Sequence, residues 1–355
     1  MRMRGNLDTT QASEKAPLFS ILIPVHNAID YIEAALRSIV SQTCVDYEVI
    51  LVDDGSTDGS GVLCDAFATE HDCVSVIHQE NKGLLLARRV ALQRARGRYI
   101  VTLDSDDALR SDALERLRDI IRMFAPDIIG FEWSHTSDFA PASNCTPRME
   151  PGLYCGEDYA AYQRCVCDGW WISLWSKCYR RSIADVGVDY SKYRGMTFAE
   201  DLLQSIPLAR AAYSFYYLAD ALYYYRPNSK SCTARYGHDY LDGLTVALYD
   251  LLRYADGMGR EFLMAAQTCA SMHMLNLTHL LVASNIGEEK TLAELRRIRT
   301  HACSLGLLDF RKAGLREDKR FEMWMLGKRW FRVLRWELML FEAVKWFRNH
   351  LSEVF

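Results

Sequence analysis

The chain has 355 residues, of which half are hydrophobic and a quarter are charged, and its formal net charge is −4. This composition is ordinary for a soluble globular protein with one large domain or two. The slightly acidic balance gives no basic footprint for nucleic acid. No run approaches the ~18 consecutive apolar residues of a membrane-spanning helix.

The N-terminus and the cysteines indicate the cellular compartment. Residues 1–17 are polar, lack the apolar core of a signal peptide, and are expected to be a disordered tail. The eleven cysteines are an odd number without metal-ligand spacing, and the close pair Cys165 and Cys167 has no second pair. We therefore expect reduced thiols and a cytoplasmic protein, with the inner face of the plasma membrane as an alternative location.

Strand-like and helix-like patterns alternate through the first part of the chain. Apolar, β-rich runs are expected to form strands at residues 20–27, 47–52, 74–78, 99–103 and 127–133. Helical spacing of apolar residues predicts helices between them, including 29–42, 84–95 and 111–124. Short loops join these elements. The alternation predicts an α/β fold with a mostly parallel sheet and helices on both faces.

The most informative motif follows the fourth of these strands. Asp104, Asp106 and Asp107 come directly after the buried run 99–103. Several carboxylates at one strand end repel one another unless a cation lies among them, and Mg²⁺ or Mn²⁺ takes oxygen ligands. Strand ends of open α/β sheets are also where ligands bind. A solvated turn or a helix N-cap is the alternative interpretation of this motif.

Six motifs in a fixed order, spread over residues 18–232, strengthen the ligand interpretation. They are Ile23-Pro24-Val25-His26-Asn27, Val52-Asp53-Asp54-Gly55-Ser56-Thr57-Asp58, Asn81-Lys82-Gly83 with Ala87-Arg88, Asp104-Ser105-Asp106-Asp107, Trp175-Ser176-Lys177 and Glu200-Asp201. In this order and spacing the chain resembles the family 2 glycosyltransferases, which have the GT-A fold. One departure is His26, which stands where the family often has Tyr and receives no catalytic role.

The resemblance implies roles for particular residues. Asp201, with Glu200 beside it, would supply the catalytic base, and Asp104 and Asp106 would hold a divalent Mn²⁺ or Mg²⁺. The residues implied in binding the nucleotide-sugar are Pro24, Asn27, Asp54, Lys82, Arg88, Asp104 and Lys177. The resemblance also implies an inverting enzyme, with a UDP-sugar as the commonest donor. The Gln-x-x-Arg-Trp motif of processive members is absent, which favours a non-processive type.

The resemblance also divides the chain. Residues 18–235 would form the glycosyltransferase domain, with a nucleotide-binding half, 18–133, and an acceptor-binding half, 134–235. Within the second half, Trp170, Trp171 and Trp175 are either core residues or a platform for a sugar. Residues 236–355 would form a helical C-terminal region.

The last segment, 319–355, has an unusual composition. It combines Trp324, Trp330, Trp336 and Trp346 with lysines and arginines at helical spacing. Such a pattern is typical of a helix at an anionic membrane surface. Docking onto the other helices or a homodimer contact are the alternatives.

The predicted function is transfer of a sugar to a hydroxyl of a glycan or lipid-linked acceptor in bacterial cell-surface polysaccharide synthesis. A sugar nucleotidylyltransferase would share a similar sheet, but it needs a Gly-rich phosphate loop near the N-terminus, where this chain has Pro24-Val25-His26-Asn27. A non-catalytic, membrane-associated binding protein is the other alternative. Nucleic acid is not an expected partner.

Overall fold

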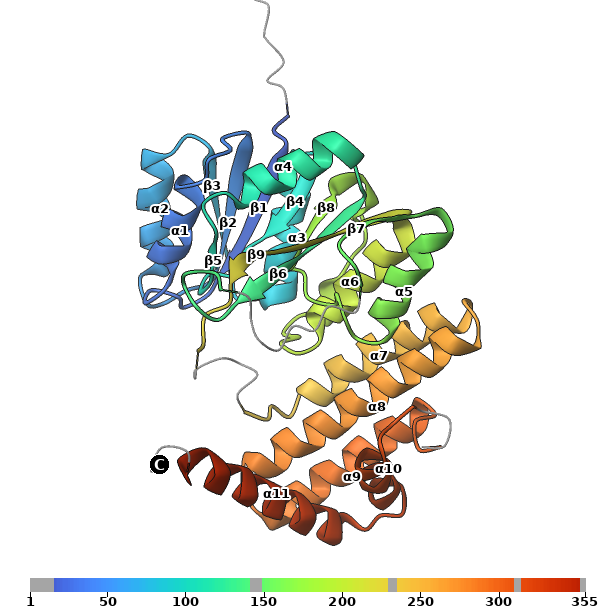
Figure 1. Ribbon diagram of the computed structural model, residues 1–355. Helices are drawn as coiled ribbons and strands as arrows, with labels where there is room; N and C mark the ends of the chain where they lie inside the picture. The colour runs from blue at the N-terminus through green and yellow to red at the C-terminus, as the bar shows by residue number, and fades with distance from the viewer. Residues whose placement is uncertain (1–15, 141–148, 229–234, 310–313, 352–355) are drawn as a thin grey trace, which may run out of the picture.

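The computed structural model of the chain describes residues 16–140, 149–228, 235–309 and 314–351, with side chains up to residue 343. Apart from its last two residues, the predicted disordered tail lies outside the described residues. An α/β part and a set of C-terminal helices lie one above the other (Figure 1).

The described residues form one nine-stranded sheet. Its strand order is β3 (Val74–Gln79), β2 (Tyr47–Asp54), β1 (Phe19–Val25), β4 (Tyr99–Thr102), β8 (Lys177–Arg180), β6 (Ile128–Ser134), β9 (Ser214–Tyr224) and β5 (Ala108–Leu109), and β7 (Gly152–Cys155) also pairs with β9. The pairs formed by β1 with β2 and β4, by β2 with β3, and by β6 with β9 are parallel. Strands β8, β5 and β7 run antiparallel to their neighbours. The predicted α/β fold with a mostly parallel sheet is confirmed.

Helices cover both faces of the sheet because successive strand side chains point to opposite sides. In β1, Ile21 and Ile23 enter one core and Leu22 enters the other. The first core contains side chains of α1 (Ile32–Val40), α2 (Ser60–Glu70) and α4 (Ala113–Phe124). The second contains side chains of α3 (Leu84–Arg94), α5 (Tyr159–Cys167) and α6 (Glu200–Ala211).

The predicted helical C-terminal region is also confirmed. It consists of α7 (Tyr240–Asp256), α8 (Arg260–Ala283), α9 (Glu288–Ser304), α10 (Glu317–Gly327) and α11 (Phe331–Leu351). Helix α7 packs on α6 and α8 packs on α5, so the second core continues from the sheet into these helices. The boundary between residues 235 and 236 stays a prediction. No helix within the described ranges is long and apolar enough to cross a bilayer.

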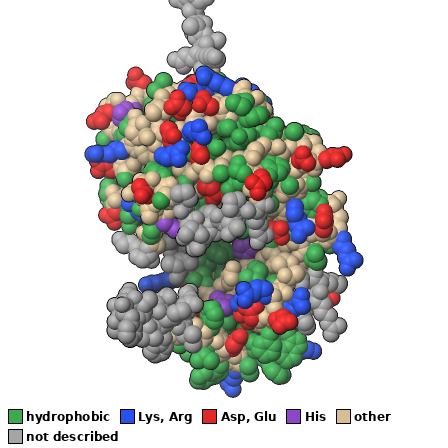
Figure 2. All heavy atoms as spheres, in the orientation of Figure 1, with side chains coloured by type: hydrophobic (Ala, Val, Ile, Leu, Met, Phe, Trp, Pro, Cys, Tyr) green, Lys and Arg blue, Asp and Glu red, His purple; other side chains and the backbone are tan. Residues whose placement is uncertain are grey.

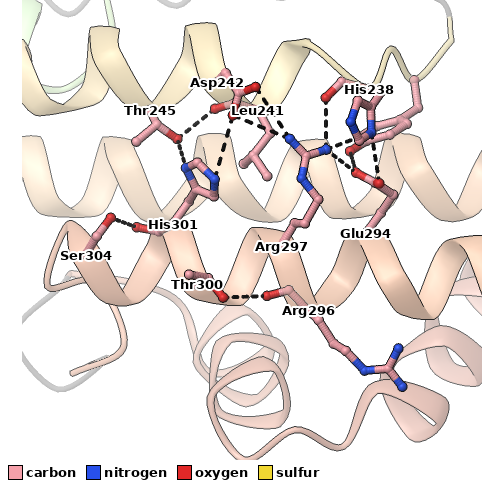
Figure 3. A network of polar contacts seen from close by, with 11 residues as sticks. His238, Leu241, Asp242, Thr245, Glu294, Arg296, Arg297, Thr300, His301 and Ser304 are labelled. Atoms are coloured by element: carbon pink, nitrogen blue, oxygen red, sulfur yellow. Dashed lines mark hydrogen bonds and ion pairs between the residues drawn. The ribbon is translucent and has the colours of Figure 1, made fainter.

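A polar network fastens the start of α7 to α9 (Figure 3). The Glu294 carboxylate accepts a hydrogen bond from Arg297 Nη1 at 2.8 Å and lies 2.9 Å from His238 Nδ1. One turn further along α9, His301 Nδ1 lies 2.9 Å from the hydroxyl of Thr245. Buried polar groups need such partners, and these contacts fix the orientation of α7 on α9.

Candidate active site

Several strands bring their polar ends to one edge of the sheet. Strands β1, β2 and β4 end there, and the antiparallel β8 begins there, because Cys178 pairs with Val101. A cavity of about 680 Å³ opens at this edge. Figure 1 shows that this edge of the sheet faces the C-terminal helices, and Figure 2 shows a hollow in the surface between the two parts. Every predicted site residue except Lys82 and Lys177 lines it.

The Asp54 carboxylate organises the wall formed by the end of β2. It accepts hydrogen bonds from the backbone N–H groups of Lys82 and Gly83, both at 2.8 Å, and from Gln79 Nε2 at 2.6 Å. These contacts shape the turn that leads into α3, where a carboxylate is favoured by the helix dipole. The structure thus uses the backbone of Lys82 to hold Asp54, while the Lys82 side chain is not brought to the cavity wall.

The loop after β1 lies beside Asp54, with His26 Nδ1 2.9 Å from the Asp54 carbonyl oxygen. Pro24 and Asn27 both line the cavity. Asn27 has a positive φ of 51°, which asparagine tolerates better than most residues. Its side-chain oxygen accepts a hydrogen bond from the Thr57 N–H at 2.8 Å. The loops after β1 and β2 therefore support each other, which gives the cavity a rigid rim.

The acidic motif after β4 divides into two environments. Asp107 is buried, and it accepts hydrogen bonds from Tyr223 Oη and the Arg226 N–H, each at 2.8 Å. Burial, together with repulsion from Asp104 and Asp106, raises the pKa of Asp107 to about 8. Asp104 and Asp106 are partly exposed and line the cavity. All three residues line the cavity, but Asp107 is buried there and ties the motif to β9, whereas Asp104 and Asp106 are partly exposed.

One arginine joins the acidic motif to the predicted base. Arg88, on α3, is 3 % exposed, and its Nη2 donates to Asp104 Oδ1 at 2.7 Å. Its Nη1 donates to Asp201 Oδ1 at 2.5 Å and lies 3.5 Å from Glu200 Oε1. Burial alone would lower the pKa of Arg88, but the three carboxylates outweigh it and raise this pKa well above its ordinary value. A single guanidinium therefore faces three carboxylates, which leaves an excess of negative charge on the cavity wall.

Glu200 and Asp201 begin helix α6 and line the cavity. The residue before them, Ala199, has φ +63°, a left-handed conformation that costs energy in a residue with a Cβ and is often found at functional sites. Burial, together with repulsion from Asp201, raises the pKa of Glu200 to about 7. Burial also raises the pKa of Asp201, against the attraction of Arg88. A carboxylate with a raised pKa is a stronger proton acceptor.

Lys177 lies behind the cavity wall. It is fully buried, and its Nζ donates to the Ser173 carbonyl at 2.6 Å and to Ser205 Oγ at 3.1 Å. Burial lowers the pKa of Lys177 to about 7, against the attraction of Asp201. This position does not support the predicted contact with a diphosphate. The ammonium instead fastens the turn before β8 to α6, and the Leu174 N–H of that turn reaches Asp201 Oδ2 at 3.4 Å.

The chemistry of the cavity wall fits a divalent cation. Asp104 and Asp106 offer hard oxygen ligands, and the Asp106 carboxylate accepts a hydrogen bond from Asn228 Nδ2 at 3.1 Å. Among the described residues no group of three or more His, Cys, Asp and Glu side chains is gathered tightly enough to hold a metal alone. Mg²⁺ commonly takes one or two carboxylates and completes its shell with substrate phosphates, so the wall fits a metal held jointly with a ligand.

Sequence reasoning missed some of the side chains that build the site. Tyr223, on β9, belongs to none of the six motifs, yet its hydroxyl accepts a hydrogen bond from the Asp104 N–H at 3.1 Å. Asn228 and Thr197 line the cavity without belonging to any of the six motifs. Trp175 lines it as well and stacks on Tyr223, with ring centroids 4.9 Å apart, so it is both a packing residue and part of the wall.

Comparisons with known proteins agree with this architecture. Residues 20–139 match the family model described as Glycosyl transferase family 2. An uncharacterized glycosyltransferase of Bacillus subtilis (strain 168), EpsJ, is 32% identical over 226 residues, which are 61% of this chain. The teichuronic acid biosynthesis glycosyltransferase TuaG of the same organism, itself putative by name, is 42% identical over 101 residues, 28% of this chain. This chain spans 63% of the length of EpsJ and 40% of TuaG.

The fold also matches a solved structure. The crystal structure of S. aureus TarS 1–349 in complex with UDP-GlcNAc superposes with a TM-score of 0.67 at 18% identity, over 89% of each chain. At this identity the likeness establishes the fold, which is of the GT-A type, and its extent shows that the C-terminal helices are included in the match.

Proposed function

We propose that this chain, which belongs to glycosyltransferase family 2, transfers a sugar from a nucleoside-diphosphate sugar to a hydroxyl group of an acceptor. The observation that carries the proposal is the cavity at the strand ends, which gathers Asp104 and Asp106 with Glu200 and Asp201 on one wall. Charge separates when the nucleoside diphosphate leaves and the acceptor loses a proton. A site for this reaction needs groups for both events, and this cavity holds both.

The donor would bind along the loops after β1, β2 and β4. Pro24, Asn27 and Asp54 form the part of the rim on which the nucleoside would rest. Asp54 also holds the turn before α3 in place by accepting hydrogen bonds from the Lys82 and Gly83 N–H groups. Asp104 and Asp106 would hold a divalent cation together with the diphosphate, and that cation supplies Lewis-acid stabilisation of the leaving group. Arg88 holds Asp104 at 2.7 Å and so limits the orientations of its carboxylate.

The acceptor hydroxyl would be deprotonated by Asp201. Arg88 and the Leu174 N–H fix the two oxygens of this carboxylate, which leaves one face of the group toward the cavity. Attack on the anomeric carbon from the side opposite the leaving group would invert that centre in one step. Glu200, with its raised pKa of about 7, is the second candidate for the base.

The proposed biological setting is synthesis of a bacterial cell-surface polysaccharide. The support is the similarity to EpsJ and to TuaG, whose name places TuaG in teichuronic acid biosynthesis. The structure compared above binds UDP-GlcNAc, which favours a UDP-sugar as the first donor to test. A glycan or a lipid-linked saccharide is the proposed acceptor.

Thermal-shift titration with UDP, GDP, CDP and ADP, each with and without Mn²⁺, tests donor binding. A nucleotide at ~100 times its dissociation constant stabilises the folded protein by about 2.7 kcal/mol, so the correct one should stand out. A panel of sugars conjugated to the selected nucleoside diphosphate is then tested as donors with saccharide acceptors. Release of nucleoside diphosphate supports a glycosyltransferase. Release of pyrophosphate from a sugar phosphate and a nucleoside triphosphate would identify a nucleotidylyltransferase, and binding without turnover would favour a binding protein.

A further inference from the structure

Helix α11 is apolar on two opposite faces. Its inner face contributes Phe331, Leu334 and Leu338 to the helical core, where they are buried. Its outer face carries four large apolar side chains that we call the outer ridge: Val333, Trp336, Met339 and Leu340. A helix at the surface of a globular domain normally turns charged or polar residues to the solvent. The outer ridge is therefore the reverse of the usual pattern.

The spacing of the outer ridge makes it one continuous surface. Val333, Trp336 and Leu340 follow one another at intervals of three and four, which places them in one row along a helix. Trp336 is 68% exposed and Leu340 is 67% exposed. Single exposed apolar residues are common, but a contiguous row with a tryptophan at its centre marks an interaction surface. In Figure 2 hydrophobic side chains gather at the end of the molecule where Figure 1 places α11.

Basic side chains stand beside the outer ridge. Lys328 and Arg329, in the turn before α11, and Arg332, in its first turn, are all exposed. Within the described part of the chain the nearby acidic partner is Glu288, which lies 3.4 Å from Arg332 and 3.8 Å from Arg335. The charges around the start of the helix are thus mainly positive. An apolar row bordered by lysine and arginine matches the chemistry of an anionic lipid surface.

The size of the outer ridge argues against a second copy of the chain as its occupant. Four side chains of this kind expose on the order of 400 Å². Two such ridges facing each other would bury roughly 800 Å², below the ~1,200 Å² at the lower end of stable protein interfaces. A lipid surface needs no complementary ridge and carries the opposite charge.

We propose that the outer ridge of α11 and its basic neighbours bind the surface of an anionic membrane, with the helix lying in the plane of the interface. Membrane binding would be reversible, because a single short apolar row with a few charges gives only peripheral attachment. Its charged component would weaken with salt as the screening length falls to ~3 Å at 1 M. This surface is separate from the cavity and from every residue assigned to sugar transfer.

Flotation of the full chain with vesicles tests the proposal. Vesicles of phosphatidylcholine with 30% phosphatidylglycerol are expected to carry the protein upward at ~50 mM salt, and pure phosphatidylcholine vesicles much less. Trp336→Ser with Leu340→Ser should lower the floated fraction at least tenfold, and Lys328→Glu with Arg329→Glu should remove the preference for anionic vesicles. Val45→Ser with Val62→Ser, at exposed apolar positions remote from α11, is the matched control and should float like the unchanged protein.

Three results would overturn the proposal. The first is flotation that the Trp336→Ser and Leu340→Ser changes leave unaltered. The second is no flotation at all in protein whose circular dichroism and nucleotide binding are normal. The third is a concentration-dependent dimer, measured by analytical ultracentrifugation, that these two changes abolish, because the occupant would then be a second copy. Nucleotide binding is measured on the same samples, so failure of the membrane proposal is distinguished from failure of the proposed function.

Discussion

Arg88 Nη1 lies 2.5 Å from Asp201 Oδ1, at the point where helix α3 meets the start of α6. The same guanidinium reaches Asp104 on the other side, so one buried cation links the carboxylate expected near the metal to the expected base. The two halves of the predicted domain are therefore joined through a charge network as well as through a core. Changes to Arg88 should affect the stability of the protein as well as its activity.

Replacement of Arg88 by Met should destabilise the protein by about 3–5 kcal/mol, because removal of one partner leaves buried carboxylates without a counter-charge. Denaturant unfolding measured by fluorescence gives the free energy. Arg37→Met is the matched control, since Arg37 forms an exposed ion pair with Glu33 and its loss should cost less than ~1 kcal/mol. The double variant Arg88→Met with Asp201→Asn should be more stable than the sum of the single effects implies. Strict additivity would contradict the network.

Asp201→Asn should reduce turnover by roughly two to four orders of magnitude, the range for loss of a general base. The amide keeps the shape of the side chain but cannot take the acceptor proton. Donor binding, measured by calorimetry with the nucleotide found by thermal shift, should be nearly unchanged. Glu200→Gln is the comparison variant. If Glu200→Gln is the change that abolishes turnover while Asp201→Asn remains active, Glu200 is the base and the assignment within the pair is wrong.

Asp106 and Asp107 are neighbours with different expected roles, so they form a matched pair of variants. Asp106→Asn should abolish the Mn²⁺-dependent part of nucleotide binding and leave stability unchanged within ~0.5 kcal/mol, because Asp106 is partly exposed at the cavity, whereas Asp107 is buried. Asp107→Asn should cost about 1–3 kcal/mol in stability, since an amide cannot accept from both Tyr223 and the Arg226 N–H. Calorimetry with and without Mn²⁺, and chemical unfolding, separate the two effects. Equal loss of metal dependence in both variants would contradict this division.

Most of the fold could be predicted from local pattern, and its antiparallel part could not. The apolar runs that became β1, β2 and β4 are short, largely buried and separated by helical spacing, which is the clearest periodic signal in a sequence. Strand β8 begins at Lys177, within a stretch that was interpreted by its tryptophans. It pairs with β4 through Cys178 and Val101, which are 77 residues apart. Long-range pairing of that kind leaves no local trace.

The candidate site shows the same limit at the level of single side chains. The motifs identified the cavity-lining carboxylates because six of them occur in a fixed order, which a solvated turn or a helix N-cap alone would not require. They did not distinguish Lys177, which packs behind the wall, from a residue that contacts ligand. They also gave no indication that Arg88 pairs with Asp201, 113 residues away. The partner of a charged residue depends on how two helices meet, and the residue type alone does not contain that information.

The raised pKa of Glu200 predicts how stability depends on pH. Its pKa of about 7 in the folded protein lies above its ordinary value of 4.5, so the folded state binds this proton more tightly than the unfolded state does. Where the folded state binds more protons, the free energy of unfolding falls as pH rises. The contribution of Glu200 should therefore be most favourable below about pH 4.5 and should be lost progressively up to about pH 7.

Glu200→Gln isolates this contribution, because the amide resembles the protonated acid and never ionises. At pH 5 the variant and the unchanged protein should have similar melting temperatures. At pH 8 the variant should melt at a higher temperature, since it avoids a buried negative charge beside Asp201. Glu157→Gln, at an exposed glutamate outside the cavity, is the control and should show the same small difference at both pH values. A difference for Glu200→Gln that is equal at pH 5 and pH 8 would mean that Glu200 in the folded protein does not change its protonation state between these pH values, and the raised pKa of Glu200 would be wrong.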